Sequence, residues 1–392
     1  MAEWVIKKLK DIAEFNPRES LAKGVVAKKV AMDKLQPFCR DIPGYELEPF
    51  SGGTKFRNGD TIMARITPCL ENGKTAKVAV LDEGEVGFGS TEYIVFRAKD
   101  GIDEDFIYYL VCSPLVREPA IKSMVGSSGR QRVQTDVVQN LEIMVPDYEE
   151  QKQISGILKS LDDKIVANTE INKNLEQQAE ALFHSLFVED VNPIWKEGVL
   201  SDLGTVVAGG TPSKTKPEYY SKKGIAWITP KDLSLNKSKF ISHGEIDISE
   251  LGSSKSSAIK MPTGTVLFSS RAPIGYIAIA ANEVTTNQGF KSVVPNENIG
   301  TAFMYYLLKF LLPTIEGMAS GSTFKEISGA GMKSVPVVIP DNETIDKFNA
   351  FCTPIFKQQE VLEAENSRLV DIRDALLLKL MVGELDVSDI EP

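Results

Sequence analysis

The sequence predicts a mixed α/β (α+β) protein in which two related globular units are joined by a long antiparallel two-helix coiled coil. Two observations carry this prediction. Much of the second half of the 392-residue chain repeats the first half, and each half ends in a long heptad pattern. The expected parts are a first globular unit, its helix, a second globular unit, and a second helix with the C-terminal tail, at residues 1–146, 147–191, 192–340 and 341–392.

The two halves share an ordered set of short motifs. Each half opens on a tryptophan, Trp4 in "WVIKKLKDIA" and Trp195 in "WKEGVLSDLG", with apolar residues five and eight positions later. Near its end each unit has a Gly/Ser loop, a short apolar run and a proline before the helix. The two prolines, Pro146 and Pro340, lie 194 positions apart. Segments that recur in one order indicate a single structural plan used twice.

Between these ends the scaffold repeats while the inserted loops differ. "RNGDTIMARITP" resembles "MPTGTVLFSSRAP", which puts Arg65 and Arg271 in matching places. Apolar runs bounded by Gly, Pro and Asn predict strands at "KVAVL", "YIVF", "GTVLF" and "YIAIAA". "FIYYLV" and "FMYYLLKFLL" predict short buried helices. "CRDIPGYELEPF" in the first unit and "GGTPSKTKPEYYSKKGIAWITPKDL" in the second have no clear counterparts.

The heptad segments predict two long helices. Asp147, with Glu150 three positions later, is typical of a capping box at a helix start. From Ile154 to Phe187 the rise of 1.5 Å per residue gives a helix of about 50 Å, which has the length of a spacer. The residues expected in the seam between the helices are Ile154, Leu158, Leu161, Ile165, Asn172, Leu175, Leu182, Ile355, Leu362, Asn366, Leu369, Leu376 and Leu380.

Asn172 and Asn366 take the same place in the two copies of the helix. Polar residues in a coiled-coil seam fix the register, so the two helices are expected to pair with each other. The link "LFVEDVNPIW" and the tail "LMVGELDVSDIEP" are expected to lie beside the second and first units. These expectations amount to a cyclic repeat with a pseudo-twofold axis and neighbouring termini.

The net charge of −10 is unevenly distributed. The globular units carry about −1 and +4, whereas the two helical segments carry −6 and −7. Local charge governs phosphate binding, so both globular units are compatible with DNA.

The most apolar run is about ten residues long and contains a lysine, so it is too short for a membrane span. The N-terminus lacks the apolar segment of a signal peptide. Scattered Cys39, Cys69, Cys112 and Cys352 suit buried thiols in a reducing cytoplasm.

Catalytic and metal-binding motifs are not recognised in the sequence. His184 and His243 have no partner motif, and no phosphate loop, nucleophile elbow or zinc motif occurs. "PDYEEQK" superficially resembles the carboxylate–lysine site of many nucleases. Its acidic residues fall within one turn of a helix start, where they stabilise exposed N–H groups, so the capping interpretation is favoured.

Basic and polar loop residues are the candidates for DNA contact, because arginine and glutamine have the donor geometry to bind base edges. A solvated loop is the alternative for each of them. The candidates are Arg65, Arg130, Gln131, Arg132, Lys214, Lys231, Arg271, Thr323, Phe324 and Lys325.

Taken together, the motifs resemble the specificity (S) subunit of type I restriction–modification systems. The residues that carry the resemblance are the tryptophan openings, "GGTPSK…YY…GIAWITPKDL", "GTVLFSSRAPIG", "TTNQGF", "GSTFKEIS" and "VPDYEEQKQI". The second helix departs from the family pattern, with "NETIDKF" at its start. The resemblance implies that each globular unit is a target recognition domain reading one half of a split DNA site, and that the helices are spacers.

The resemblance also implies the partners. They are double-stranded DNA, two adenine-methylating M subunits and, through the complex, ATP-driven R subunits, in the cytoplasm and without a membrane. S-adenosylmethionine, ATP and Mg²⁺ would belong to those partners, and no cofactor or catalytic residue is expected in this chain. The alternatives are a free-standing nuclease or methyltransferase, which the missing motifs disfavour, and a coiled-coil scaffold whose two domains bind ligands other than DNA.

Overall fold

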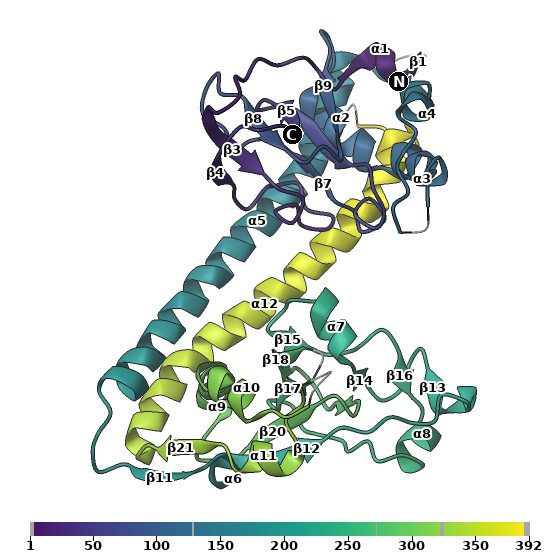
Figure 1. The fold of residues 1–392 in the computed structure, drawn as a ribbon. Coiled ribbons are helices and arrows are strands. Elements are labelled where there is room, and N and C mark those ends of the chain that lie inside the picture. The colour runs from purple at the N-terminus through teal and green to yellow at the C-terminus, as the bar shows by residue number, and fades with distance from the viewer. Residues whose placement is uncertain (1–3, 128, 272, 322–324, 388–392) are drawn as a thin grey trace. The chain divides into compact units, whose positions relative to one another are not determined.

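The computed structural model describes residues 4–127, 129–271, 273–321 and 325–387 (Figure 1). The chain forms two compact units. Unit 1 comprises residues 1–166 and 367–392, and unit 2 comprises residues 167–366. Two long helices contribute a segment to each unit, so every unit is built from a globular part and two helix segments.

Unit 1 contains two four-stranded sheets and a separate strand pair. One sheet has the order β2-β9-β6-β7 and the other β4-β3-β8-β5, while β1 pairs with β10. The strands are β1 Val5–Lys8, β2 Ala13–Phe15, β3 Val26–Val30, β4 Glu46–Pro49, β5 Thr54–Phe56, β6 Thr61–Ala64, β7 Thr75–Lys77, β8 Gly87–Gly89, β9 Tyr93–Ala98 and β10 Glu142–Val145.

The helices of unit 1 cover the first of these sheets. α2 packs on β6, β7 and β9, and the main apolar core forms between α2, the sheet and the long helices. The short globular helices are α1 Leu9–Ile12, α2 Glu104–Cys112, α3 Pro114–Lys122 and α4 Thr135–Gln139. The C-terminal tail joins this core, where Val387 is fully buried and Gly383 lies against the indole of Trp4. The predicted position of the tail beside the first unit is confirmed.

Unit 2 is built around a five-stranded sheet of order β12-β20-β17-β18-β15. β11 pairs with β21, as β1 pairs with β10, and two further strand pairs are β13-β16 and β14-β19. The strands are β11 Lys196–Val199, β12 Gly204–Ala208, β13 Tyr220–Ser221, β14 Trp227–Ile228, β15 Phe240–Ile241, β16 Asp247–Ile248, β17 Val266–Ser270, β18 Ile274–Ala280, β19 Thr285–Thr286, β20 Lys291–Pro295 and β21 Pro336–Ile339.

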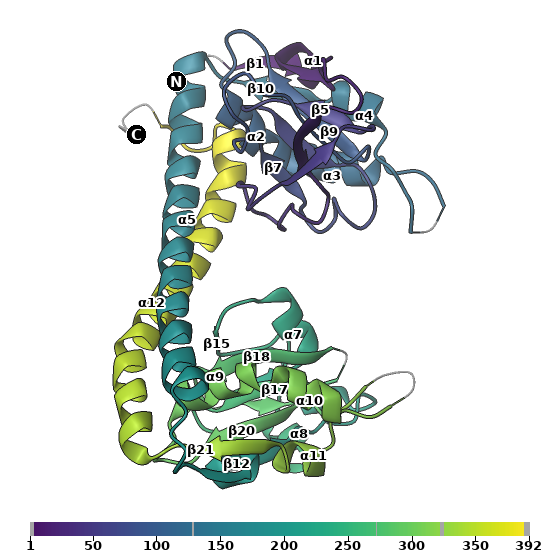
Figure 2. The same cartoon turned by 60° about the vertical axis from the view of Figure 1, so that its left-hand side comes forward.

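In unit 2, α9 packs on β17, β18 and β20, as α2 does on its sheet (Figure 2). The globular helices are α6 Leu200–Leu203, the 3₁₀ turn Pro217–Tyr219, α7 Pro230–Leu235, α8 Glu250–Ser254, α9 Thr301–Phe310, α10 Leu312–Met318 and α11 Gly329–Lys333. The residues that follow each tryptophan by five and eight positions, Leu9, Ile12, Leu200 and Leu203, are all buried. That spacing therefore reflects packing in both units.

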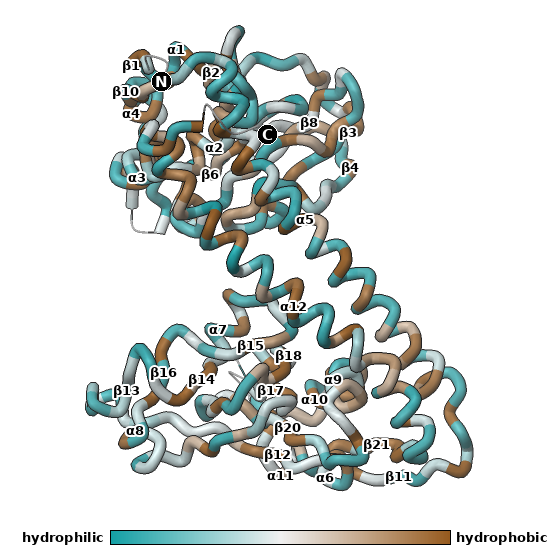
Figure 3. The backbone as a smooth tube through the Cα atoms, turned by 180° about the vertical axis from the view of Figure 1, so that it is seen from behind, coloured by the Kyte–Doolittle hydropathy of each residue, from teal (hydrophilic) through white to brown (hydrophobic). Residues whose placement is uncertain are grey.

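The two long helices are α5 Tyr148–His184, which ends in a π-helical turn at Ser185–Glu189, and α12 Asn342–Met381. Apolar and polar residues alternate along both of them (Figure 3). Asp147 accepts a hydrogen bond from the Glu150 N–H at 2.9 Å, and Asp341 accepts the equivalent bond from Thr344 at 2.9 Å. The predicted aspartate cap is confirmed, and it recurs in the second copy.

Within unit 2 the segments of α5 and α12 run antiparallel. Asn168 donates to Asn366 at 2.9 Å, and Gln359 donates to the Asn172 carbonyl at 3.1 Å. The rings of Phe183 and Phe348 meet edge to face, with centroids 5.7 Å apart. Asn366 thus bonds to the side chains of Asn168 and Thr169 rather than facing its repeat equivalent Asn172, because in an antiparallel pair equivalent positions face each other at only one point along the helices.

None of the predicted seam residues is exposed. Ile154, Leu158, Ile355, Leu362 and Leu380 are buried, and the other eight are half-buried.

Two expectations about the globular units and the cysteines were wrong. "KVAVL" was predicted as a strand, but β7 ends at Lys77, its first residue. All four cysteines are free, yet only Cys352 is buried and Cys39 is exposed.

Candidate nucleic-acid interface

A hairpin loop is fastened to the end of strand β6 in unit 1. We call residues 125–133 loop 1; Ser128 lies outside the described residues. Val125 and Arg132 exchange backbone hydrogen bonds of 3.0 and 2.9 Å, and the Val133 N–H donates to the Arg65 carbonyl at 2.8 Å. Gly126 has φ +136, and a Cβ there would lie 2.9 Å from the Arg130 carbonyl oxygen, so only glycine fits that turn.

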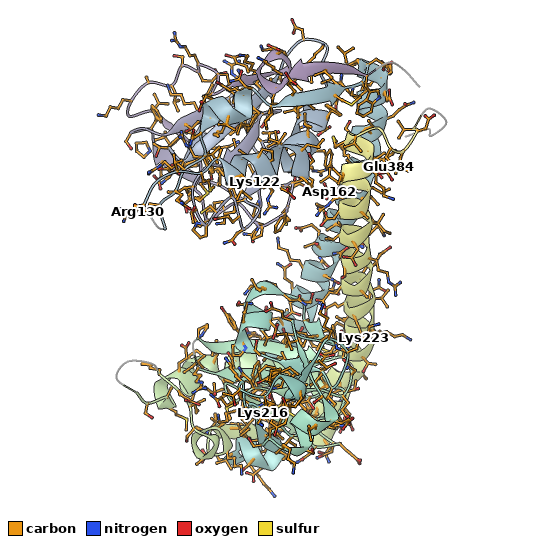
Figure 4. The ribbon with its side chains drawn as sticks, turned by 90° about the vertical axis from the view of Figure 1, so that its right-hand side faces the viewer. Lys122, Arg130, Asp162, Lys216, Lys223 and Glu384 are labelled. Carbon is orange, nitrogen blue, oxygen red and sulfur yellow. The ribbon has the colours of Figure 1, made fainter. Side chains whose placement is uncertain are left out.

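Loop 1 carries three of the predicted DNA-binding residues in different environments. Arg130 is exposed and lies on the projecting loop (Figure 4), and Gln131 is half-buried. The Arg132 guanidinium pairs with Glu92, with Nε 2.9 Å from each carboxylate oxygen and Nη2 2.6 Å from Oε1. This bidentate bond from Arg132 lowers the pKa of Glu92.

Arg65 lies beneath loop 1 rather than on its surface. It is half-buried, and its Nη2 donates to the Val133 carbonyl at 3.3 Å. Its backbone N–H donates to the Glu92 carbonyl at 2.9 Å, which continues the pairing of β6 with β9. Its guanidinium thus supports the base of loop 1 and is not presented to solvent as Arg130 is.

Unit 2 has the same construction at the end of β17. We call residues 320–327 loop 2; Thr323 and Phe324 of the predicted set lie outside the described residues, as does residue 322. Ser320 and Glu326 exchange backbone hydrogen bonds of 3.1 and 2.9 Å, and the Ile327 N–H donates to the Ser270 carbonyl at 3.1 Å. Lys325 is exposed.

The two loops correct one sequence match. Since Val133 binds Arg65 while its repeat equivalent Ile327 binds Ser270, Arg65 corresponds to Ser270 and not to Arg271. The isolated bridges agree, because Ile66 pairs with Arg132 and Arg271 pairs with Glu326. Arg271 therefore takes the place of Ile66. Arg271 contacts Glu326, with its Nη1 3.3 Å from Oε2.

The remaining candidates lie in the segments that are special to unit 2. Lys214 is exposed in the turn after Gly209 and Gly210. Lys231 is exposed in the first turn of α7, and its Nζ lies 2.5 Å from Glu245 Oε2. Neither lysine contacts loop 2 through any interaction seen in the described part of unit 2. The structure thus brings Arg65, Arg130, Gln131 and Arg132 together, brings Arg271 to the base of loop 2, and leaves these two lysines apart.

Sequence reasoning missed a group of buried polar side chains where each globular part meets the long helices. In unit 1, Asp162 of α5 accepts from Tyr109 and pairs with Arg373 of α12. In unit 2, Glu176 of α5 pairs with Lys239 and Lys309. The matched "YY" pair in the two globular helices was the signal that could have located them, since both second tyrosines take part.

The described residues also bear on metal binding and membrane insertion. No cluster of three or more His, Cys, Asp or Glu residues suited to a metal ion occurs in the ranges that the structure describes. Among the helices of those same ranges, none is both long and apolar enough to cross a membrane.

Comparison with known proteins points to one family. The family model for the type I restriction modification DNA specificity domain matches residues 1–177 and residues 193–365. The type I restriction enzyme MjaIX specificity subunit of Methanocaldococcus jannaschii is 38% identical over 178 residues, which cover 43% of this chain and 41% of that protein. The HindI specificity subunit of Haemophilus influenzae is 24% identical over 424 aligned residues, covering 88% of this chain and 89% of that protein.

A solved structure agrees in fold. The type I restriction–modification system S subunit from M. genitalium superposes with a TM-score of 0.60 over 97% of this chain and 96% of that one, at 18% sequence identity. The arrangement of two sheet-containing parts with long helices is therefore shared along nearly the whole chain.

Proposed function

Because the chain belongs to the family of type I restriction modification DNA specificity domains, we propose that it is the DNA-recognition subunit of a type I restriction–modification complex. It binds a split DNA target and directs adenine methylation or restriction by partner subunits. The observation that carries this proposal is the double match of the family model, once in each half of the chain. Two readers in one chain suit a target made of two half-sites.

The loops provide a physical basis for two different readings. Loop 1 and loop 2 share their backbone hydrogen bonds at the base but differ in side chains, with "GRQR" in one and "TFKE" in the other. Arginine and glutamine can bind guanine and adenine edges in the major groove, whereas lysine acts mainly as a phosphate contact. One scaffold with exchanged loop residues therefore reads two different half-sites.

The long helices are proposed to be the spacer between the two DNA-recognition domains. Residues 1–146 and 192–340 would be target recognition domains, and residues 147–191 and 341–392 would be the two spacer helices with the tail. A two-helix antiparallel coiled coil with a pseudo-twofold axis would fix the gap between half-sites and orient the readers towards opposite strands. This part of the proposal is supported by the burial of the predicted seam residues, none of which is exposed.

The partners follow from the same proposal. The chain itself carries out no chemistry and holds no cofactor, and it delivers two M subunits and, through them, R subunits to double-stranded DNA in the cytoplasm. S-adenosylmethionine, ATP and Mg²⁺ are then bound by those partners. The alternative of a scaffold for other ligands gains no support from the relatives, which are specificity subunits.

Sequencing of methylated bases in a host that expresses this chain with its M subunit tests the function. We expect one split motif, with a fixed gap between two defined halves. Exchanging residues 205–340 for the matching segment of another family member should change one half and keep the other half and the gap. A continuous motif, or no sequence-specific methylation with a competent M subunit, contradicts the proposal.

A further inference from the structure

In both units the residue that closes the loop forms a surface ion pair with the neighbouring sheet residues, but the charge of that loop residue is opposite in the two units. In unit 1 the cation is on the loop: Arg132 of loop 1 pairs with Glu92, the residue before β9. In unit 2 the anion is on the loop: Glu326 of loop 2 lies 3.3 Å from Arg271 Nη1 and 3.5 Å from Lys291 Nζ.

The backbone shows that these are equivalent positions. Arg132 and Glu326 each close their loop by two hydrogen bonds, to Val125 and Ser320 respectively. Each is followed by the residue that donates to the strand end beneath it.

The partners come from the neighbourhood of matching strands, β9 beside β6 and β20 beside β17, but not from equivalent positions. Arg65 donates to the Glu92 carbonyl while Ser270 donates to the Gly289 carbonyl, so Glu92 corresponds to Gly289. Lys291 lies two residues further along β20, and Arg271 directly follows β17.

The exchange of sign limits what this position can do. A residue that contacts DNA phosphates must be a cation or a neutral donor, because a carboxylate there is repelled. Glu326 does not meet that requirement, yet it takes the place of Arg132. What the two units share is an attraction between the loop end and the sheet, and that attraction works with either polarity.

We propose that Arg132 and Glu326 are positioning residues that fasten each recognition loop to its sheet, while the exposed neighbours Arg130 and Lys325 face DNA. The inference rests on the proposed function and refines it, because the sequence alone placed Arg132 among the base-reading candidates. In unit 1 the ion pair of Arg132 with Glu92, which we call the tie, is bidentate and fixes the direction in which loop 1 leaves β6.

The tie controls loop placement rather than the stability of the unit. The side chains of Arg132 and Glu92 are 47% and 23% exposed, and pairs at such exposure contribute little to folding. A loop held by few contacts, in contrast, depends on each of them for its position. Loss of the tie should therefore weaken recognition while leaving the unfolding temperature nearly unchanged.

A charge-exchange experiment on the complex with M subunits separates the two roles of Arg132. The variants are Arg132→Glu, Glu92→Arg and the double variant, which recreates the polarity of unit 2. Affinity for a duplex with the motif is measured at fixed salt, together with methylation of each half-site. Lys152→Glu is the matched control, because it makes the same charge change in an exposed pair with Glu149 at the start of α5.

We expect each single reversal to weaken binding by about tenfold, the factor that corresponds to 1.4 kcal/mol, and to relax only the first half-site. The double variant should return to within about threefold of the parent, and Lys152→Glu should stay within about twofold. The second half of the motif, read by unit 2, serves as a control within the same molecule.

Two results would overturn the inference. If the double variant binds as weakly as Arg132→Glu while its unfolding temperature is unchanged, Arg132 contacts DNA directly. If Glu92→Gln, which removes the tie with little change in shape, leaves affinity and motif unaltered, the tie does not position the loop. A parent chain that reads no split motif contradicts the proposed function instead, so the two failures are distinguishable.

Discussion

The two units neutralise a buried carboxylate in different ways beside matching globular helices. The second tyrosine of each globular "YY" helix donates to an acid on α5: Tyr109 to Asp162 at 2.7 Å in unit 1, and Tyr306 to Glu176 at 2.8 Å in unit 2. The cation in unit 1 is Arg373 of α12. In unit 2 the cations are Lys239, beside β15, and Lys309 of α9, and both come from the globular part.

The difference shows which part of the repeat is maintained. The tyrosine recurs and finds a carboxylate in each unit, because a hydroxyl buried against a long helix needs an acceptor. The acid itself comes from the helix that follows the globular part in unit 1 and from the helix that precedes it in unit 2. The cation comes from another element in each unit, since any buried donor that reaches the acid satisfies the charge. Asp162 and Arg373 are only 4% and 8% exposed, so they form an interior ion pair and not a surface pair (Figure 4 shows Asp162).

The cluster in unit 2 is the larger of the two. Lys239 also donates to Gln359 at 2.7 Å and lies over the ring of Phe356, 4.3 Å from its centroid. Burial by itself would raise the pKa of Glu176, but Lys239 and Lys309 outweigh burial and lower that pKa to about 2. The charged form of Glu176 is thus strongly stabilised by folding.

Glu176→Gln should have the largest effect of the substitutions considered, by lowering the free energy of unfolding of unit 2. It leaves Lys239, which is 8% exposed, without its carboxylate partner, and an uncompensated buried charge costs about 3–5 kcal/mol of the free energy of unfolding. Urea unfolding followed by tryptophan fluorescence in a Trp4→Phe background reports on unit 2, because Trp195 and Trp227 both lie there. Glu180→Gln is the control, since Glu180 is a more exposed partner of Lys309 on the same helix. Equal effects of the two variants would contradict the prediction.

Acidification tests the same group without a mutation. The folded pKa of Glu176, about 2, lies below the ordinary value of 4.5, so its contribution is complete above pH 4.5 and is lost as pH falls towards 2. The loss amounts to about 3 kcal/mol, from 1.36 kcal/mol per pKa unit. Urea titrations at several pH values between 6 and 2.5 should show this decline in unit 2. The Glu176→Gln variant should show a smaller one, and identical slopes would exclude Glu176 as the source.

Arg373→Met should cost less, about 1.5–3 kcal/mol, the range for hydrogen bonds to charged groups. Asp162 keeps the hydrogen bond from Tyr109, and methionine retains much of the volume of the arginine stem. Hydrogen exchange read by mass spectrometry should show loosening of α2 and of the α12 segment in unit 1. The exposed Arg368→Met on the same helix should have little effect. A loss in unit 1 larger than that of Glu176→Gln in unit 2 would reverse the proposed ranking.

Much of the scaffold was predictable because it depends on local patterns. The spacing of Leu9 and Ile12 after Trp4, the aspartate cap at Asp147 and the heptads of α5 can each be read within a short stretch of sequence. Such patterns survive divergence between the two copies, so offsets of 191 positions for the tryptophan segment and 194 for the cap and helix located the second set.

The polar contacts could not be predicted, since they depend on distant segments. Lys239 stands in "LNKSKF" near a second lysine, Lys237, and nothing local distinguishes the buried one from its neighbour. Its burial is decided by Glu176 and Gln359, which come from two other elements. The match of Arg65 with Arg271 failed for a related reason: a one-residue shift in the alignment of the two copies is invisible until the hydrogen bonds of Val133 and Ile327 fix the register.

The smallest expected effects distinguish the two recognition loops. Arg130 in loop 1 has the donor fork that binds a base edge, so Arg130→Ala should cost about 1–2 kcal/mol of binding free energy and relax one position of the first half-site. Lys325 in loop 2 is exposed and suits a phosphate, so Lys325→Ala should weaken all sequences alike and reduce the salt dependence of binding by about one counterion. Binding titrations at several salt concentrations, on duplexes altered at single positions, measure both properties. Lys357→Ala on α12 is the reference, because it changes one exposed lysine in unit 2. If Arg130→Ala leaves both motif and affinity unchanged, loop 1 does not read the first half-site, although the pairing of two readers would still rest on the repeated scaffold.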